Sequence, residues 1–115
     1  GQGEIYRFVD FFQGHDICVG LSLNENSNKY NSSQMDFIHV SNYDYFQGKK
    51  LSIKQVSDSV SKFKVLNKPI IVDGGVGCDN IALYKKAGAT SFVCGRSLFT
   101  YNSLESYIQL LKLIR

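Results

Sequence analysis

The chain has 115 residues, of which 43% are hydrophobic and 20% are charged, and these proportions are typical of one globular domain spanning residues 1–115. The formal net charge of +3 is small and the basic residues are scattered, which argues against a nucleic-acid partner. No apolar run approaches the roughly 20 residues that cross a bilayer. The three cysteines show no C-x-x-C spacing, which argues against a disulfide framework or a zinc site, so a cytoplasmic location is expected.

The first half of the chain is predicted to contain one helix and two strands. Apolar residues recur at helical spacing from Ile5 to Phe12, and Gly14 then supplies a helix stop. The elements predicted next are, in order, a strand at residues 17–23, a polar Asn-rich loop with room for a short helix at residues 24–34, a strand at residues 35–41 and a loop at residues 42–50.

The second half is predicted to alternate helices with strands. Ser52 and Gln55 form a capping-box pattern, which predicts a helix with Ile53, Val56, Val60 and Phe63 on one face. The remaining predicted elements are, in order, a strand at residues 70–73, a helix at residues 81–87 closed by Gly88, a strand at residues 91–94, and a final helix capped by Asn102 with Leu104, Tyr107, Ile108 and Leu111 facing inward.

This alternation predicts an α/β fold. The two later strands lack polar alternation, which is typical of a parallel sheet covered by helices. Four units of about 20 to 30 residues each suit a (β/α) barrel or a doubly wound sheet. The glycine turn after residue 73 has Asn80 where the dinucleotide-binding fingerprint needs its third glycine, so it does not fit that fingerprint.

The most informative stretch is Ile70-Ile71-Val72-Asp73-Gly74-Gly75-Val76-Gly77. A strand that reads as buried ends in a carboxylate, and glycines follow it directly. A carboxylate at the tip of a strand is placed for chemistry, and bare backbone N–H groups beyond it can hold an anion. The alternative is that Asp73 only starts a turn or caps a helix, because Asp before Gly-Gly is a common turn sequence.

These residues resemble the ribulose-phosphate 3-epimerase family over roughly residues 5–100. Val72-Asp73-Gly74-Gly75-Val76 resembles the family's seventh-strand motif, and the spacing through Lys86-Ala87-Gly88-Ala89 to Phe92-Val93-Cys94-Gly95 resembles its run into strand eight. Upstream, Leu21-Ser22-Leu23-Asn24-Glu25-Asn26-Ser27 resembles the S-x-N-P-x-T that ends strand five. Met35-Asp36-Phe37-Ile38-His39-Val40-Ser41 stands where strand six is expected.

The resemblance implies a ribulose-phosphate-binding TIM barrel, of which this chain matches strands five to eight. A full barrel usually needs about 200 residues or more, so we expect a parallel (β/α)4-type half-barrel. Such a half leaves two sheet edges and an apolar inner face exposed. The chain is therefore expected either to be a fragment of a longer barrel, completed by the missing N-terminal half, or to form a homo-oligomer.

The resemblance also implies a reaction and a metal. The family interconverts D-ribulose 5-phosphate and D-xylulose 5-phosphate by proton transfer at C3, with a divalent ion (zinc, iron, manganese or cobalt) stabilising the enediolate. The family's seventh-strand Asp is an acid/base and a metal ligand, and Asp73 matches it. The family's other Asp and its two His ligands lie outside the match. His15 and His39 match no ligand position, and His39 is expected to face the covering helices.

The predicted ligand is a phosphorylated ketose, held in the loops after strands seven and eight. The expected phosphate-binding residues are Gly74, Gly75 and Gly77 in the first loop and Gly95, Arg96 and Ser97 in the second. At the position of Gly95-Arg96 the epimerase family usually has Gly-Ser. The Gly-Arg pair is more similar to the related decarboxylase and hexulose-phosphate synthase group. Arg96 can grip a phosphate through two parallel hydrogen bonds, or alternatively be a surface residue paired with a carboxylate.

Two further loops complete the predicted pocket. Ser22 and Asn24 either end strand five beside the substrate or satisfy local backbone groups of a turn. In the loop after strand six, Phe46 and Gly48 match the family's M-x-V-x-P-G-F-x-G-Q, with Gly48 expected to contact the substrate, and Val40 replaces the Met that lines the pocket. The aromatic residues of this loop either stack on a ligand or pack in an assembly interface.

Three functions stay open. The first is the C-terminal half of a ribulose-phosphate 3-epimerase-like enzyme, with an incomplete active site in this chain alone. The second is a non-catalytic half-barrel that binds phosphosugars or a partner protein. The third is a decarboxylase, or an aldol-type lyase related to hexulose-phosphate synthase, which Gly95-Arg96 favours.

Overall fold

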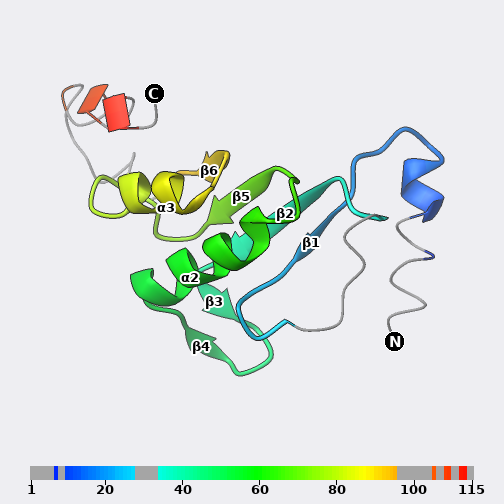
Figure 1. Cartoon of the computed structure of the whole chain (residues 1–115), viewed down its shortest axis with the longest axis horizontal. Helices are drawn as coiled ribbons and strands as arrows, with labels where there is room; N and C mark the ends of the chain where they lie inside the picture. Colours follow the sequence, from blue (N-terminus) through cyan, green and yellow to red (C-terminus); the bar gives the residue numbers. More distant parts are fainter. Residues whose placement is uncertain are drawn as a thin grey trace.

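A computed structural model of the chain describes residues 7, 10–27, 34–95, 105, 108–109 and 112–113, and its main feature is a four-stranded sheet (Figure 1). The strands are, in spatial order, β1 (Gly20–Ser22), β2 (Phe37–Ser41), β5 (Ile70–Asp73) and β6 (Ser91–Val93). Each strand is parallel to its neighbour, which confirms the parallel α/β half-barrel expected from the sequence.

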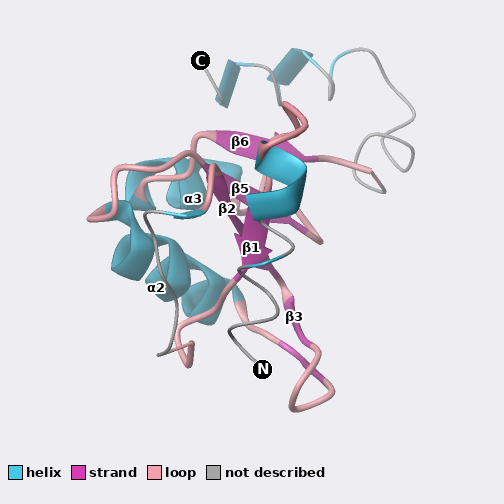
Figure 2. Cartoon of the chain, turned by 90° about the vertical axis from the view of Figure 1, so that its right-hand side faces the viewer, coloured by secondary structure: helices cyan, strands magenta, loops and turns pink. Residues whose placement is uncertain are grey.

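Two helices, α2 (Ile53–Lys64) and α3 (Ile81–Ala87), lie on one side of this sheet (Figure 2). Successive side chains of a strand point to opposite faces, and alternate residues of the two central strands are buried beneath α2. The buried hydrophobic core consists of Met35, Ile38, Val40, Leu51, Val56, Val60, Phe63, Ile70, Val72, Val76, Ile81, Tyr84 and Ala89. The core therefore lies between the sheet and its helices.

The other side of the sheet is only partly covered by the described residues, and we call it the open face. It carries the alternate side chains of the strands, which are Ser22, Phe37, His39, Ser41, Ile71, Asp73, Ser91 and Val93. Val93 is 48% exposed. The Phe37 ring lies against Gly20 of the neighbouring strand, where a Cβ would come within 2.2 Å of it. The open face corresponds to the inner face of a barrel that these four strands do not close.

Residues 42–50 form a β-hairpin instead of the predicted loop. Strand β3 (Tyr43–Asp44) pairs antiparallel with β4 (Lys49–Lys50). Asp44 is 2% exposed, and its carboxylate accepts hydrogen bonds from the N–H groups of Phe46 at 3.0 Å and Gln47 at 3.1 Å, which fixes the turn. Strands of two residues are too short to show an alternating pattern, which is why periodicity missed them.

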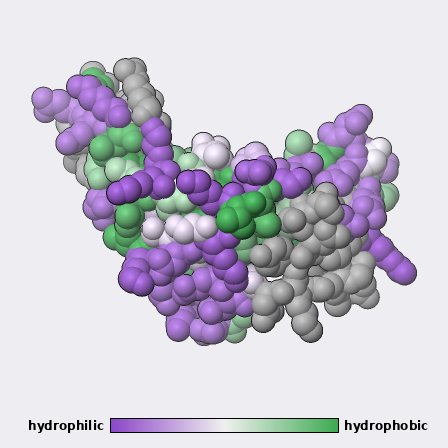
Figure 3. All heavy atoms as spheres, viewed as in Figure 1, coloured by the Kyte–Doolittle hydropathy of each residue, from purple (hydrophilic) through white to green (hydrophobic). Residues whose placement is uncertain are grey.

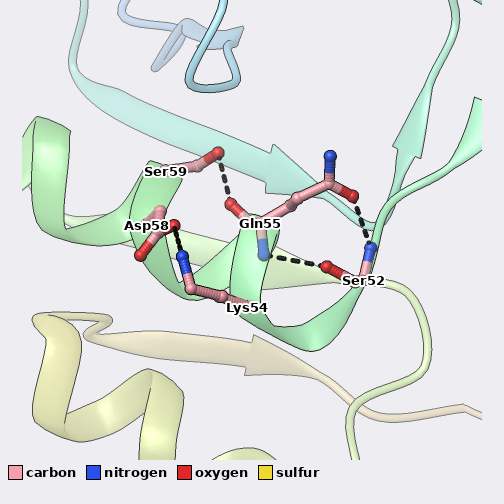
Figure 4. Close-up of polar contacts among 5 residues, drawn as sticks. All are labelled: Ser52, Lys54, Gln55, Asp58 and Ser59. Carbon is pink, nitrogen blue, oxygen red and sulfur yellow. Dashed lines mark hydrogen bonds and ion pairs between the residues drawn. The ribbon is translucent and has the colours of Figure 1, made fainter.

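Helix α2 begins with the predicted capping box (Figure 4). The Ser52 hydroxyl accepts a hydrogen bond from the Gln55 N–H at 3.1 Å, and the Gln55 side chain accepts one from the Ser52 N–H at 2.9 Å. On the next turn, the buried Ser59 hydroxyl donates to the Gln55 carbonyl and accepts from the Glu25 N–H, both at 2.9 Å. The cap therefore fixes the helix start, and Ser59 ties the loop after β1 to the helix.

Replacing Ser52 with Ala is expected to lower the free energy of unfolding by about 1 kcal/mol, because it removes the acceptor of the Gln55 N–H group. Urea unfolding followed by circular dichroism measures the change. Ser57, inside the helix, provides the matched Ser→Ala control, for which no loss is expected because Ala is the better helix former. Equal losses at both positions would contradict a capping role.

The helices predicted at the two ends of the chain are confirmed only in part. Residues 10–13 are helical, and the Gly14 N–H donates to the Asp10 carbonyl as the helix ends. Of the predicted C-terminal helix, Asn102, Leu104, Tyr107 and Leu111 lie outside the described residues. Ile108 was predicted to face inward but is 42% exposed, whereas Leu113 packs against the core.

Hydrophobic side chains also reach the surface, as the face seen in Figure 3 shows. The most exposed are Phe46 at 100%, Val65 at 79% and Tyr45 at 76%. Within the described ranges, no helix combines the length and the apolar character needed to cross a membrane.

Candidate functional site

The carboxyl ends of the four parallel strands meet at one edge of the sheet. The register places Ser22 beside His39, Ser41 beside Asp73, and Asp73 beside Val93. The loops that follow β5 and β6 therefore leave the sheet side by side, as the sequence analysis required for a site shared between them. Ligand sites of parallel α/β folds lie at this edge.

A chain of hydrogen bonds crosses three strands on the open face. The Ser22 hydroxyl lies 2.9 Å from His39 Nδ1, and His39 Nε2 lies 3.0 Å from Asp73 Oδ2. The side chains of His39 and Asp73 are 29% and 44% exposed, so both can be reached by a ligand. An ionised carboxylate only accepts hydrogen bonds, so the Nε2–H group of His39 donates to Asp73. An imidazole and a carboxylate in this contact can hold or pass one proton.

The prediction that His39 faces the covering helices is wrong. Ile38 and Val40 fill the core beneath α2, so the residue between them points to the open face. For the same reason Val40, which was matched to a pocket-lining Met, is fully buried and lines no pocket on that face. Polar residues at 39 and 41 alternate with apolar residues at 38 and 40, but the apolar Phe37 belongs to the same set as His39, so the sequence pattern is ambiguous.

The loop after β5 is a turn built on glycines. Gly74 and Gly75 have φ angles of +99° and +64°, which side chains rarely adopt. A Cβ on Gly74 would also lie 2.1 Å from Asn42 Oδ1. Among the described residues, the N–H groups of Gly74 and Gly75 have no acceptor. These two amides are therefore available to an anion.

The next part of the loop is closed by the buried Asn80. Its Oδ1 accepts a hydrogen bond from the Gly77 N–H at 2.9 Å, and its Nδ2 donates to the Gly75 carbonyl at 2.8 Å. No pattern in the sequence predicts this role of Asn80. Because the Gly77 N–H is already bonded, Gly77 shapes the loop rather than offering a free amide.

The other predicted ligand residues have mixed surroundings. Gly95 follows β6 with nothing within 4 Å of the position a Cβ would take, whereas Arg96 and Ser97 lie outside the described residues. The Asn24 side chain accepts a hydrogen bond from the Asn26 N–H at 2.8 Å, as a turn residue does. The Gly48 N–H donates to the Asp44 carbonyl inside the hairpin. The binding roles of these residues stay predictions.

A divalent metal at Asp73 would need more ligands than the described residues provide. Asp73 and His39 supply one carboxylate and one imidazole. Across the described part of the chain, no group of three or more His, Cys, Asp or Glu side chains is placed to hold a metal ion. Catalytic zinc sites, for comparison, have three protein ligands. These residues therefore do not fit a complete metal centre, and the metal stays a prediction.

Each loop of the site contains a thiol. Cys78 follows the glycine turn, and Cys94 comes directly after β6. Burial, and then the charge of Cys78, raise the pKa of the Cys94 thiol. Since the thiolate is the reactive form, we expect iodoacetamide at neutral pH to modify Cys94 more slowly than the exposed Cys18. Peptide mass spectrometry over time measures both rates, and faster modification of Cys94 would contradict this expectation.

Two comparisons with known proteins agree with this geometry. A third comparison, with curated protein sequences, finds no match. Among solved structures, a crystal structure of 3-hexulose-6-phosphate synthase matches with a TM-score of 0.67 and 20% sequence identity. The match covers 100% of this chain and 58% of the synthase chain, so this chain spans little more than half of that protein.

The family comparison covers the two central strands, the hairpin, both helices and the two loops of the site. The model of the ribulose-phosphate 3 epimerase family matches residues 29–99, which is more than half of the chain. The matched segment contains His39, Asp73 and the glycine turn. The chain belongs to the ribulose-phosphate 3 epimerase family.

Proposed function

We propose that this chain forms part of a sugar-phosphate site that removes a proton next to a ketone, and that its reaction is the interconversion of D-ribulose 5-phosphate and D-xylulose 5-phosphate. The observation that carries the proposal is the 3.0 Å contact between His39 Nε2 and Asp73 Oδ2, directly before a glycine turn whose first two N–H groups find no acceptor in the described part of the chain. Family membership supports the same substrate class.

The described groups divide the work between binding and proton transfer. The N–H groups of Gly74 and Gly75 hold the phosphate, which fixes the sugar relative to Asp73. The Asp73 carboxylate removes the proton from C3 of the ketose, and the electron pair moves to the carbonyl to form an enediolate. His39 lies close enough to donate a hydrogen bond to the Asp73 carboxylate and so orient it. Positioned acid–base groups of this kind accelerate proton transfer by about 10²–10⁴-fold.

Epimerisation also needs a proton delivered to the opposite face of the enediolate. Asp73 and His39 lie on neighbouring strands and contact each other, so they reach the same face. We propose that the opposite-face acid comes from a second half-barrel, either another segment of the same protein or a second copy of this chain. The partly covered open face and the two sheet edges, at β1 and β6, which pair with no further strand in the described ranges, are consistent with such a completion.

A second candidate function is carbon–carbon bond chemistry on the same kind of enediolate. Attack on one face of an enediolate needs acid–base groups on one side only, which is what His39 and Asp73 provide. The structural similarity to 3-hexulose-6-phosphate synthase favours this candidate at the level of the fold. In a 3-hexulose the ketone is at C3, so the added carbon joins C1 of a 2-ketose and the proton must leave C1 instead of C3.

Proton exchange in D₂O distinguishes these candidates. We would incubate the full-length protein with ribulose 5-phosphate, with and without a divalent metal ion, and follow the sugar by NMR. Deuterium at C3 together with xylulose 5-phosphate is expected for the epimerase. Deuterium at C1 alone would support the synthase-like reaction, and phosphate binding without exchange would support a non-catalytic module. A protein that shows neither phosphate binding nor proton exchange would overturn the proposal.

A further inference from the structure

Asn42 holds a position in the site that no comparison and no sequence motif assigns. It links β2 to the hairpin, and both of its backbone groups are hydrogen-bonded. Its N–H donates to the Asp73 carbonyl at 3.0 Å, and its carbonyl accepts from the Leu51 N–H at 2.7 Å, where the hairpin returns to the sheet. Asn42 is therefore fixed at the base of the hairpin, beside the proposed base Asp73.

The Asn42 carboxamide lies across both glycines of the turn. Its Oδ1 would be 2.1 Å from a Cβ on Gly74, and its Nδ2 would be 3.0 Å from a Cβ on Gly75. A Cβ on Gly74 would overlap this carboxamide unless the Asn42 side chain moved, and a Cβ on Gly75 would make an unusually tight contact with it. The position of Asn42 therefore adds to the preference for glycine that the φ angles already set. Among the described residues, this carboxamide makes no hydrogen bond, although it can donate two and accept two.

We propose that Asn42 is a ligand-binding residue that donates a hydrogen bond from its carboxamide to the same phosphate group that the N–H groups of Gly74 and Gly75 hold. The inference rests on the proposed function and adds a side-chain donor from a different strand. A phosphate presents three acceptor oxygens and therefore suits three such donors better than a hydroxyl group does.

The chemistry of Asn suits this position. A lysine or arginine here would form an ion pair with Asp73 and compete with the ligand, whereas a neutral amide donates without pairing. A carboxylate would repel both Asp73 and the phosphate. Because the backbone of Asn42 is already fixed on both sides, little conformational entropy is lost when its side chain binds.

Phosphate titrations of the full chain test this role, with inorganic phosphate and ribulose 5-phosphate as probes. In ¹⁵N-resolved NMR spectra of the unmutated protein, the side-chain NH₂ signal of Asn42 is expected to shift together with the backbone amides of Gly74 and Gly75. Asn42→Ala is expected to weaken binding by about 10-fold, because a hydrogen bond to a charged group is lost. Asn42→Asp, which keeps the shape, is expected to weaken it further.

Gln47→Ala is the matched control, since Gln47 is an exposed amide in the same hairpin, and it should leave the affinity unchanged. Melting curves of each variant separate loss of binding from loss of folding, and the NMR titration needs no variant. Unchanged affinity in Asn42→Asp, or shifts at the two glycines without a shift at Asn42, would overturn this inference alone. If the unmutated protein binds neither probe, the proposed function and this inference both fail.

Discussion

Replacing Asp73 with Asn is expected to lower the rate of proton exchange at C3 of ribulose 5-phosphate by about 10²–10⁴-fold, the range that a positioned acid–base group contributes. The amide keeps the shape of the side chain and can still contact His39, but it cannot remove a proton. Phosphate affinity should stay the same or increase, because a negative charge next to the bound dianion has been removed. NMR in D₂O measures the exchange, and a phosphate titration measures the affinity.

Asp58→Asn provides the matched control for the charge change. Asp58 lies on α2, where its carboxylate is 3.1 Å from Lys54 Nζ and half exposed, so the variant should keep the full exchange rate. The outcome that contradicts the role of Asp73 is an Asp73→Asn protein that is folded and binds phosphate, yet exchanges at the rate of the unmutated protein.

The central position of Asp73 could be predicted from the sequence because local signals agreed. An apolar strand that ends in a carboxylate and three nearby glycines is visible without any tertiary contact. His39 could not be placed in the same way. Phe37, Ile38 and Val40 are all apolar, so the pattern alone did not say which alternate set faces the helices. The register against β5 decides it, and that register is set by long-range packing.

The hairpin and Asn42 show a second limit of sequence reasoning. The turn at Asp44 depends on a buried carboxylate that bonds two backbone N–H groups, and nothing in the order of residues distinguishes it from a loop. The close approach of Asn42 to Gly74 joins residues that are far apart in the sequence and adjacent only through the β2–β5 pairing. The sequence thus predicted the glycine turn but not the side chain that lies across it.

The largest effect on stability is expected from replacing Phe63 with Ala. Phe63 is fully buried in the last turn of α2, within the core between the helices and the sheet. The truncation removes most of an aromatic side chain and leaves a cavity, which typically costs about 3–5 kcal/mol. The whole free energy of unfolding of a small domain is only about 5–15 kcal/mol. Urea unfolding followed by circular dichroism should therefore show a much lower midpoint.

Val65→Ala is the control, because Val65 lies two residues further along, is 79% exposed, and should change the free energy of unfolding by less than about 0.5 kcal/mol. Since α2 packs on the strands that carry His39 and Asp73, phosphate binding by Phe63→Ala should be lost over the same urea range as its helical signal. A Phe63→Ala protein with an unchanged midpoint would contradict the packing of α2 on this sheet. Binding that survives beyond the loss of helix would show that the glycine turn holds its shape without the layer beneath it.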